Sequence, residues 1–170
     1  MLYPIVISQF SKMLGNLLNI LDKAAAHAET KKFDIEVLLQ ARLSPDQFNL
    51  IRQVQVACDT AKLAAARLAD KEQDAPTHAD TETNLVETKA RLQSVIDYLQ
   101  SLKAADFDGA TQRRITQPRW KGKSLSGEEF LIQHAVPNLY FHVTTAYAIL
   151  RNNGVEVGKM DFLGELPFKE

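Results

Sequence analysis

The stretch HAVPNLYFHVTTAYAILRNNG, residues 134–154, decides the fold and raises its main question. Its apolar residues recur every three or four positions, the period of an amphipathic helix, and Gly154 is placed to end that helix in a left-handed conformation. In a helical projection, Asn138 and His142 both fall within the apolar stripe, one turn apart. Pro137 removes one helix hydrogen bond beside them, so we expect a kink or a free carbonyl there. Because burying an unpartnered amide costs about 1–3 kcal/mol, both side chains need polar partners.

Polar partners for this pair are available in two parts of the chain. In the helical segment that follows residue 44, Gln55 borders the apolar stripe and Asp59 continues the same polar edge. Tyr140 and Thr145 lie beside the pair in sequence. Two interpretations stay open: a satisfied hydrogen-bond network around one core histidine, or a ligand pocket between bundle helices, where such folds build their sites.

Three further segments carry the helical period, so the sequence predicts an all-α four-helix bundle in one domain, residues 1–170. The first helix starts after Tyr3, with Pro4 in its first turn. Ser44, Pro45 and Gln47 together resemble a capping box and predict the start of the second helix. The third helix is expected over residues 83–103, a short helical turn over residues 35–40, and up-and-down connectivity for the whole bundle.

Residues 105–125 are the part of the chain that does not look helical. Lys121-Gly122-Lys123 predicts the turn of a short hairpin. Ser126 and Glu129 then form a capping box that opens the last helix. The tail, residues 155–168, contains seven apolar residues, and we expect it to pack back along the bundle.

Composition and charge exclude several classes of protein. The 170 residues are 45% hydrophobic and 24% charged, with a net charge of −1, so no global charge favours nucleic acid or an anionic membrane. The single cysteine, Cys58, cannot form an internal disulfide, and no apolar run approaches the roughly 20 residues of a membrane span. The first residues, MLYPIVISQF, lack the features of a secretory signal. We expect a cytoplasmic protein with no membrane or nucleic-acid partner.

The hairpin carries a local basic patch around Trp120, with no acidic residue between Asp108 and Glu128. Phosphate contacts and base stacking on the indole would be a nucleic-acid interpretation. The near-neutral total charge favours a solvated hairpin whose tryptophan caps the bundle, and an access route for a small anion is a third interpretation. The basic residues of the patch are Arg113, Arg114, Arg119, Lys121 and Lys123.

Two stretches resemble a known family: QVQVACDTAK, residues 53–62, and YFHVTTAYAILRNNGVEVGKMDFLG, residues 140–164. They are similar to the hallmark segments of domain-of-unknown-function family 1993, which is similar to the DinB-like helical bundles. The resemblance spans essentially the whole chain, and the closing GKMDFLG is its most specific part. It implies a DinB-like four-helix bundle and, because DinB-like proteins often pair, a homodimer.

The resemblance also implies a metal site, one histidine on the second helix and a His-x-x-x-His on the fourth. His142 matches the last of these ligands, but Asn138 occupies the position of the preceding histidine. On the second helix Gln53 or Gln55 stands where a ligand would be, and helical phase favours Gln55. Amide oxygens hold transition metals weakly, so we expect a degenerate site without a cofactor, with His142 as the ligand of any divalent metal that binds.

These observations predict a small-molecule binding protein with an interhelical pocket around Asn138 and His142. The alternatives are a metal-dependent hydrolase or transferase using His142 as metal ligand or general base, and a purely structural dimerising bundle. Cys58 could serve as a nucleophile beside His142, although a helical cysteine among apolar neighbours is usually inert packing. The candidate pocket residues are Gln55, Asp59, Asn138, Tyr140, His142 and Thr145.

Overall fold

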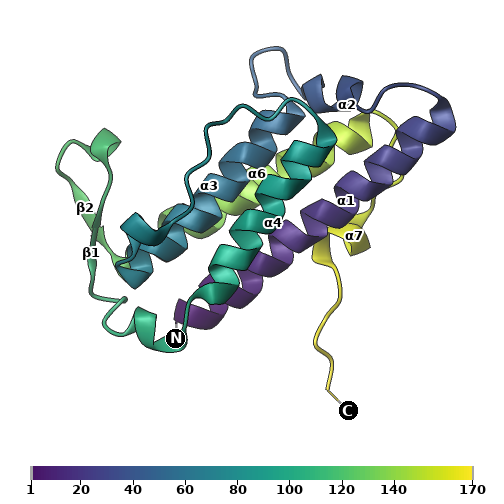
Figure 1. The fold of residues 1–170 in the computed structure, drawn as a ribbon. Helices are drawn as coiled ribbons and strands as arrows, with labels where there is room; N and C mark the ends of the chain where they lie inside the picture. The colour runs from purple at the N-terminus through teal and green to yellow at the C-terminus, as the bar shows by residue number, and fades with distance from the viewer. Residues whose placement is uncertain (1, 170) are drawn as a thin grey trace.

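The computed structural model describes residues 2–169 and contains four long helices with a two-stranded hairpin before the last one (Figure 1). The predicted helical bundle and hairpin are therefore confirmed. No helix among the described residues is long and apolar enough to cross a membrane. The helices are α1 (Phe10–Lys31), α2 (Glu36–Gln40), α3 (Leu50–Ala69), α4 (Leu85–Ser101), α5 (Gly127–Phe130), α6 (Val136–Asn152) and α7 (Lys159–Leu163), and the strands are β1 (Arg114–Thr116) and β2 (Ser124–Ser126).

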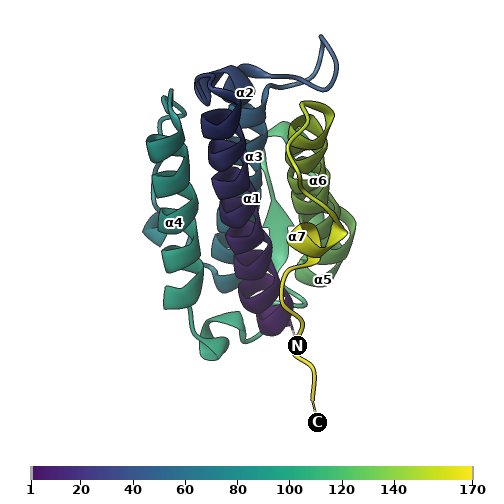
Figure 2. The same cartoon turned by 90° about the vertical axis from the view of Figure 1, so that its right-hand side faces the viewer.

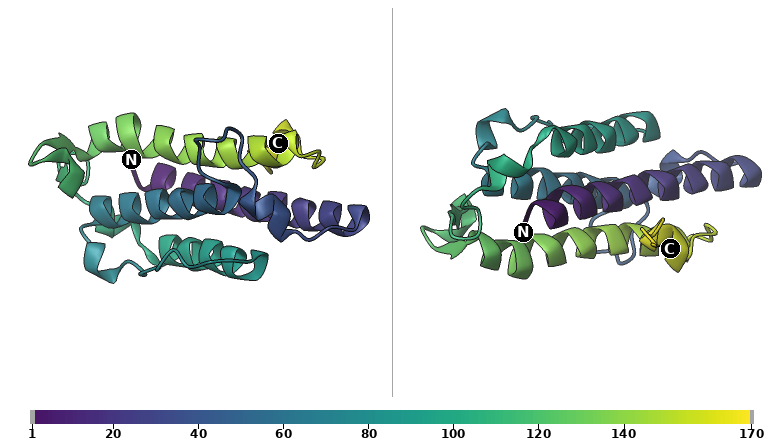
Figure 3. Two further views of the ribbon diagram at one scale, coloured as in Figure 1. Left: turned by 90° about the horizontal axis from the view of Figure 1, so that it is seen from above. Right: turned by 90° about the horizontal axis from the view of Figure 1, so that it is seen from below.

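The long helices lie side by side with roughly aligned axes (Figure 2 and Figure 3). Their apolar faces meet in one hydrophobic core, because each helix carries its apolar residues at helical spacing. The last helix consists of α5, a π-helical turn (Leu131–Ala135) and α6. The largest fully buried side chains include Phe10, Met13, Leu14, Leu17, Leu39, Leu50, Leu68, Leu92, Leu99 and Phe130.

The helices α3 and α4 run in the same direction, so the predicted up-and-down connectivity is wrong. Asp59 on α3 meets Arg91 on α4, and further along both helices Lys71 accepts a hydrogen bond from Tyr98. Residues 70–84 cross back along the bundle between the two helices (Figure 1). When extended they span roughly 45–50 Å, whereas a 20-residue helix is roughly 30 Å long, so the crossover is sterically easy.

One of the two predicted capping boxes forms. Ser126 and Glu129 cap each other's backbone N–H groups at the start of α5, as predicted. The box predicted from Ser44 is wrong, because its hydroxyl donates to Asp46 in the loop at 2.7 Å. Asn49 caps α3 instead, accepting from the backbone N–H of residue 52 at 3.0 Å, so the helix begins at Leu50.

The tail packs along the bundle over its first half. Val155 and Val157 are buried, and Asn16 on α1 donates to the carbonyl of Phe162 at 2.9 Å. The predicted packing holds as far as α7, whereas Phe168 is 87% exposed. Gly154 adopts a positive φ of 85° after α6, which confirms the predicted end of that helix.

A pair of glycine substitutions tests how the hairpin joins the last helix. Gly127 is buried at the first turn of α5, where an added Cβ would overlap the carbonyl oxygen of Ala110 and press on Leu68. Gly127→Ala is expected to lower the free energy of unfolding by about 1–3 kcal/mol or more, because backbone must move.

Gly15→Ala is the matched control. Gly15 lies inside α1 and a Cβ there meets nothing within 4 Å. Alanine should therefore raise the free energy of unfolding by about 0.5–1 kcal/mol. Urea unfolding of both variants checks the pair, and equal effects at the two positions would contradict the account.

Candidate functional site

His142 is buried between α6 and α3, where it pairs with Gln53. Its Nδ1 lies 2.7 Å from Oε1 of Gln53, and the Nε2 of Gln53 donates to the carbonyl of Phe48 at 3.3 Å. Because that second bond orients the amide, the oxygen faces the imidazole and Nδ1 carries the proton. The Nε2 atom of His142 keeps its lone pair and has no hydrogen-bond partner within residues 2–169.

Gln55 is not the partner of the histidine, so the choice made from helical phase is wrong. Two residues correspond to roughly 200° on a helix, and Gln55 therefore faces α4 and the crossover. It accepts from Arg52 at 3.0 Å and donates to Glu82 at 2.8 Å. Gln53 occupies the place opposite His142.

The hydroxyls of Tyr140 and Thr145 form hydrogen bonds with residues other than His142. The hydroxyl of Tyr140 accepts from Gln9, near the start of α1, at 2.6 Å. The hydroxyl of Thr145 donates to the carbonyl of Phe141 within α6 at 2.7 Å. The structure thus distributes the candidate residues over separate local networks.

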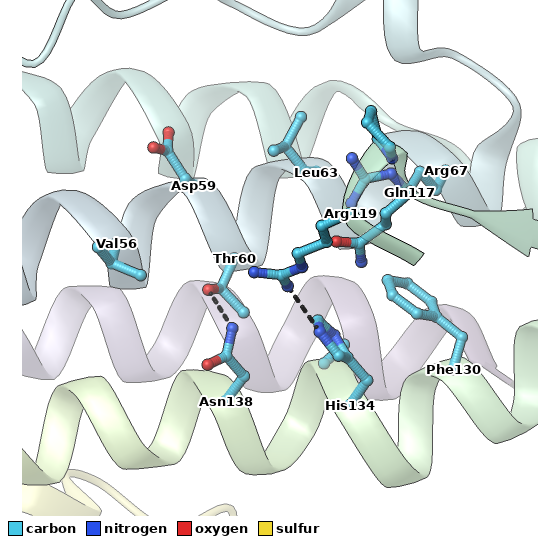
Figure 4. Close-up of a pocket in the computed structure, with 12 residues that line it drawn as sticks. Val56, Asp59, Thr60, Leu63, Arg67, Gln117, Arg119, Phe130, His134 and Asn138 are labelled. Atoms are coloured by element: carbon cyan, nitrogen blue, oxygen red, sulfur yellow. Dashed lines mark hydrogen bonds between the residues drawn. The ribbon is translucent and has the colours of Figure 1, made fainter. Parts of the chain in front are cut away.

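A pocket of about 350 Å³ lies between α3, the last helix and the hairpin, and we call it the interhelical pocket. Asn138 and Asp59 line it, whereas His142, Gln55, Tyr140 and Thr145 do not. Asn138 is half-buried and donates to the hydroxyl of Thr60 at 2.9 Å, which ties α6 to α3 at the pocket (Figure 4).

The walls of the interhelical pocket come from three elements. On α3, half-buried residues recur every three or four positions and form one wall. The last helix and the hairpin close the other sides (Figure 4). The lining residues besides Asp59 and Asn138 are Val56, Thr60, Leu63 and Arg67 on α3, Phe130, His134 and Ala135 on the last helix, and Gln117, Pro118 and Arg119 on the hairpin.

The π-helical turn Leu131–Ala135 shapes the last helix at the pocket. The N–H of Val136 bonds to the carbonyl of Leu131, one residue further back than in an α-helix. This wider turn precedes Pro137, whose ring would crowd a regular helical turn. The expected disturbance at Pro137 therefore takes the form of a π-helical turn, which carries His134 into the pocket wall.

His134 and Gln117 are functional candidates that sequence reasoning missed. The His134 ring stacks on Phe130 with 5.4 Å between centroids, and its Nε2 accepts from Arg119 at 2.9 Å (Figure 4). Its Nδ1 is buried without a partner, as is Nε2 of Gln117. The one available signal was that His134 lies one turn before Asn138, whereas the hairpin residues carry no local signal of their position.

The residues at the positions of the metal site that the sequence resemblance implied do not fit a metal ion. The oxygen and the nitrogen of the Gln53 amide both form hydrogen bonds, and the amide nitrogen of Asn138 donates to the hydroxyl of Thr60. Within residues 2–169, no group of three or more His, Cys, Asp or Glu side chains is arranged to hold a metal. One imidazole with amide oxygens is a weak donor set, and the oxygen of Gln53 already accepts from His142, so no step through a metal follows from this geometry.

Cys58 lies wholly inside the core. Burial raises the pKa of its thiol to about 12. The thiolate is therefore absent at neutral pH, and a nucleophilic role for Cys58 has no support in the geometry.

The histidines make a testable contribution to pH dependence. Burial, followed by the charge of Arg52, lowers the pKa of His142, and burial with Arg119 and Arg67 lowers the pKa of His134. The unfolded chain therefore binds more protons below about pH 6.5. The contribution of these two histidines to the free energy of unfolding is fully present above that pH and falls as the pH drops toward 5.

NMR titration of the imidazole signals should give midpoints below 6.5 for both histidines. Urea unfolding should show that His142→Asn, which cannot protonate, has a smaller loss of stability between pH 7 and pH 5 than the unmodified protein. Midpoints at or above 6.5 would contradict the burial of these rings.

Comparison with known proteins places the chain in a family. Residues 2–163 match the family model described as "Domain of unknown function (DUF1993)". The chain is also similar to the solved structure of a DinB family member protein from Shewanella denitrificans, with 59% sequence identity over 100% of this chain and 96% of that chain and a TM-score of 0.97. No curated protein matches it. The chain therefore belongs to the DUF1993 family and has the fold of a DinB family member.

Proposed function

We propose that this protein binds a small organic molecule in the interhelical pocket. The observation that carries the proposal is a pair of buried polar atoms in residues of its lining, Nε2 of Gln117 and Nδ1 of His134, which have no hydrogen-bond partner within residues 2–169. A buried polar atom without a partner costs about 1–3 kcal/mol. Neither atom is accessible in this structure, so a ligand with hydrogen-bond acceptors would recover that free energy by turning these side chains toward the pocket.

The size and chemistry of the pocket support the same proposal. Its volume of about 350 Å³ falls in the range of small-molecule sites. The half-buried apolar side chains of Val56 and Leu63 supply contact area, and a few polar groups stand among them. This mixture is typical of ligand sites rather than of empty gaps between helices.

General-base catalysis by His142 is a second candidate function. It rests on the neutral imidazole, whose Nδ1 proton is held by Gln53 so that Nε2 can accept a proton. Since His142 does not line the interhelical pocket, the two candidates are separable. Substitution of His142 by Asn would remove the base and leave the pocket lining unchanged.

The test uses three probes that share a phenyl ring and differ in charge: benzamide, benzoate and benzylamine. Binding is followed by ¹⁵N–¹H NMR. Leu63 is half-buried on the α3 wall, so Leu63→Trp places a larger side chain in the pocket with little effect on the core. At least one probe should shift signals of pocket residues, and Leu63→Trp should weaken that binding more than 10-fold.

Leu63→Met is the matched control, because it keeps the side-chain volume and should bind the same probe as the unmodified protein does. Failure of all three probes to bind, or equal binding by Leu63→Trp and the unmodified protein, would contradict the proposal and favour the purely structural bundle.

A further inference from the structure

We propose that the ligand carries a carboxylate, which the guanidinium of Arg119 binds at the hairpin end of the interhelical pocket. This inference rests on the proposed function and deepens it by naming the chemical class of the ligand. It is carried by the hydrogen-bond donors and charges that surround that end of the pocket.

Arg119 has unused donors. A guanidinium has five N–H groups, and the structure engages Arg119 in one hydrogen bond, from Nη2 to His134. No carboxylate within residues 2–169 forms a salt bridge with it. The neighbouring Arg114, by contrast, donates to the hydroxyl of Ser124 and the carbonyl of Gly122. Arg119 therefore presents a free, planar set of donors to the pocket, the arrangement that binds carboxylates best.

The unpartnered atoms at this end of the pocket are donors as well. Because Arg119 can only donate, Nε2 of His134 accepts and the proton of the neutral ring is on Nδ1. Burial and the nearby charge of Arg119 lower the pKa of His134, which keeps the ring neutral at pH 7. Nδ1 of His134 and Nε2 of Gln117 are thus two N–H donors without acceptors. Neither atom is accessible as the side chains stand, so Arg119 is the donor that meets a ligand first, and both atoms would favour an acceptor once their side chains turn toward it.

The other charges of the pocket are already balanced. Arg67 is paired with Glu72 at 2.9 Å. Asp59 is paired with Lys62 at 3.0 Å and with Arg91 at 2.9 Å. Within residues 2–169, Arg119 is therefore the charged lining residue without an oppositely charged partner, and it favours an anion.

A second hollow, on the outer side of the hairpin, gives the pocket a cationic approach. Arg119 and His134 line both hollows, so this pair lies between them, and Lys121 and Lys123 line the outer one together with Trp120. Neither lysine forms a salt bridge within residues 2–169. Clustered positive charge raises the local concentration of anions.

The apolar part of the lining favours an organic acid over a bare inorganic anion. Leu63 and Val56 stand half-buried on the α3 wall (Figure 4). An inorganic phosphate would reach the donors but leave this surface uncovered, whereas an organic carboxylate would bury it. Apolar contact contributes about 25 cal/mol for each Å² removed from water.

The experiment compares benzoate with benzamide, which has the same shape without the charge, and with inorganic phosphate and benzylamine. Dissociation constants are measured by NMR titration at pH 7 and low ionic strength. Benzoate should bind at least 10-fold more tightly than benzamide. Arg119→Met should reduce the affinity for benzoate to that for benzamide, and Arg119→Lys should restore part of it, because a lysine keeps the charge but loses the planar donors.

Arg114→Met is the matched control, since it removes an arginine of the same hairpin that donates to Ser124 and Gly122 and does not line the pocket. It should leave benzoate binding unchanged, and NMR spectra of each variant report whether the hairpin remains folded. Equal binding of benzoate and benzamide would overturn the carboxylate inference while the pocket itself stood. Tighter binding of phosphate than benzoate, or an equal loss in Arg114→Met and Arg119→Met, would overturn it too.

Discussion

The buried guanidinium of Arg91 joins α4 to α3 and to the crossover segment, residues 70–84. Its side chain is 1% exposed, and it binds Asp59 on α3 at 2.9 Å and Asp80 and Glu82 on the crossover at 2.5 and 3.1 Å. Burial alone would lower the pKa of Arg91, but the hydrogen bond to Asp80 and the charges of Asp59 and Glu82 raise it, so the charge is retained. Removing one partner of a fully buried pair typically costs about 3–5 kcal/mol, and loss of one of these carboxylates costs less, because they are 12–34% exposed and two others remain. The parallel packing of α3 and α4 therefore depends on this cluster, since it fastens the crossover between them.

The same helix that receives Arg91 also builds the pocket. One face of α3 presents Asp59 to Arg91, and the adjoining face presents Gln53 and Thr60 to the last helix. The hydrogen bonds from His142 to Gln53 and from Asn138 to Thr60 hold α3 against α6. The π-helical turn, which precedes Asn138, widens the last helix, and the hairpin covers the space between this turn and α3 (Figure 4). The pocket therefore lies beside the π-helical turn, next to the part of the last helix that these hydrogen bonds hold against α3.

Local signals in the sequence were sufficient for the elements but not for their arrangement. The helical period of the apolar residues, the box of Ser126 and Glu129, and the turn at Gly122 all predicted what the structure contains. The parallel packing of α3 and α4 escaped prediction because periodicity says which face is buried and nothing about direction. The cap before α3 was misplaced, because Asn49 rather than Ser44 lies directly before the first helical residue.

The site was predictable in part for the same reason. His142 and Asn138 stood out because they break an apolar stripe, and both prove to bond across to α3. Gln53 and Gln55 face nearly opposite sides of α3, so the choice between them depended on the rotation of that helix, which the apolar stripe alone did not specify. Arg119 and Gln117 reach the pocket only because the hairpin packs against α3 and the last helix, so no local sequence pattern predicts them as pocket residues.

The central claim is that the interhelical pocket receives an organic carboxylate at Arg119. A crystal structure of the protein in complex with benzoate tests it most directly. The account predicts the carboxylate within hydrogen-bonding distance of Arg119, with the ring against Leu63 and Val56. A ring bound elsewhere on the surface, or one in the pocket with its carboxylate directed away from Arg119, would contradict it.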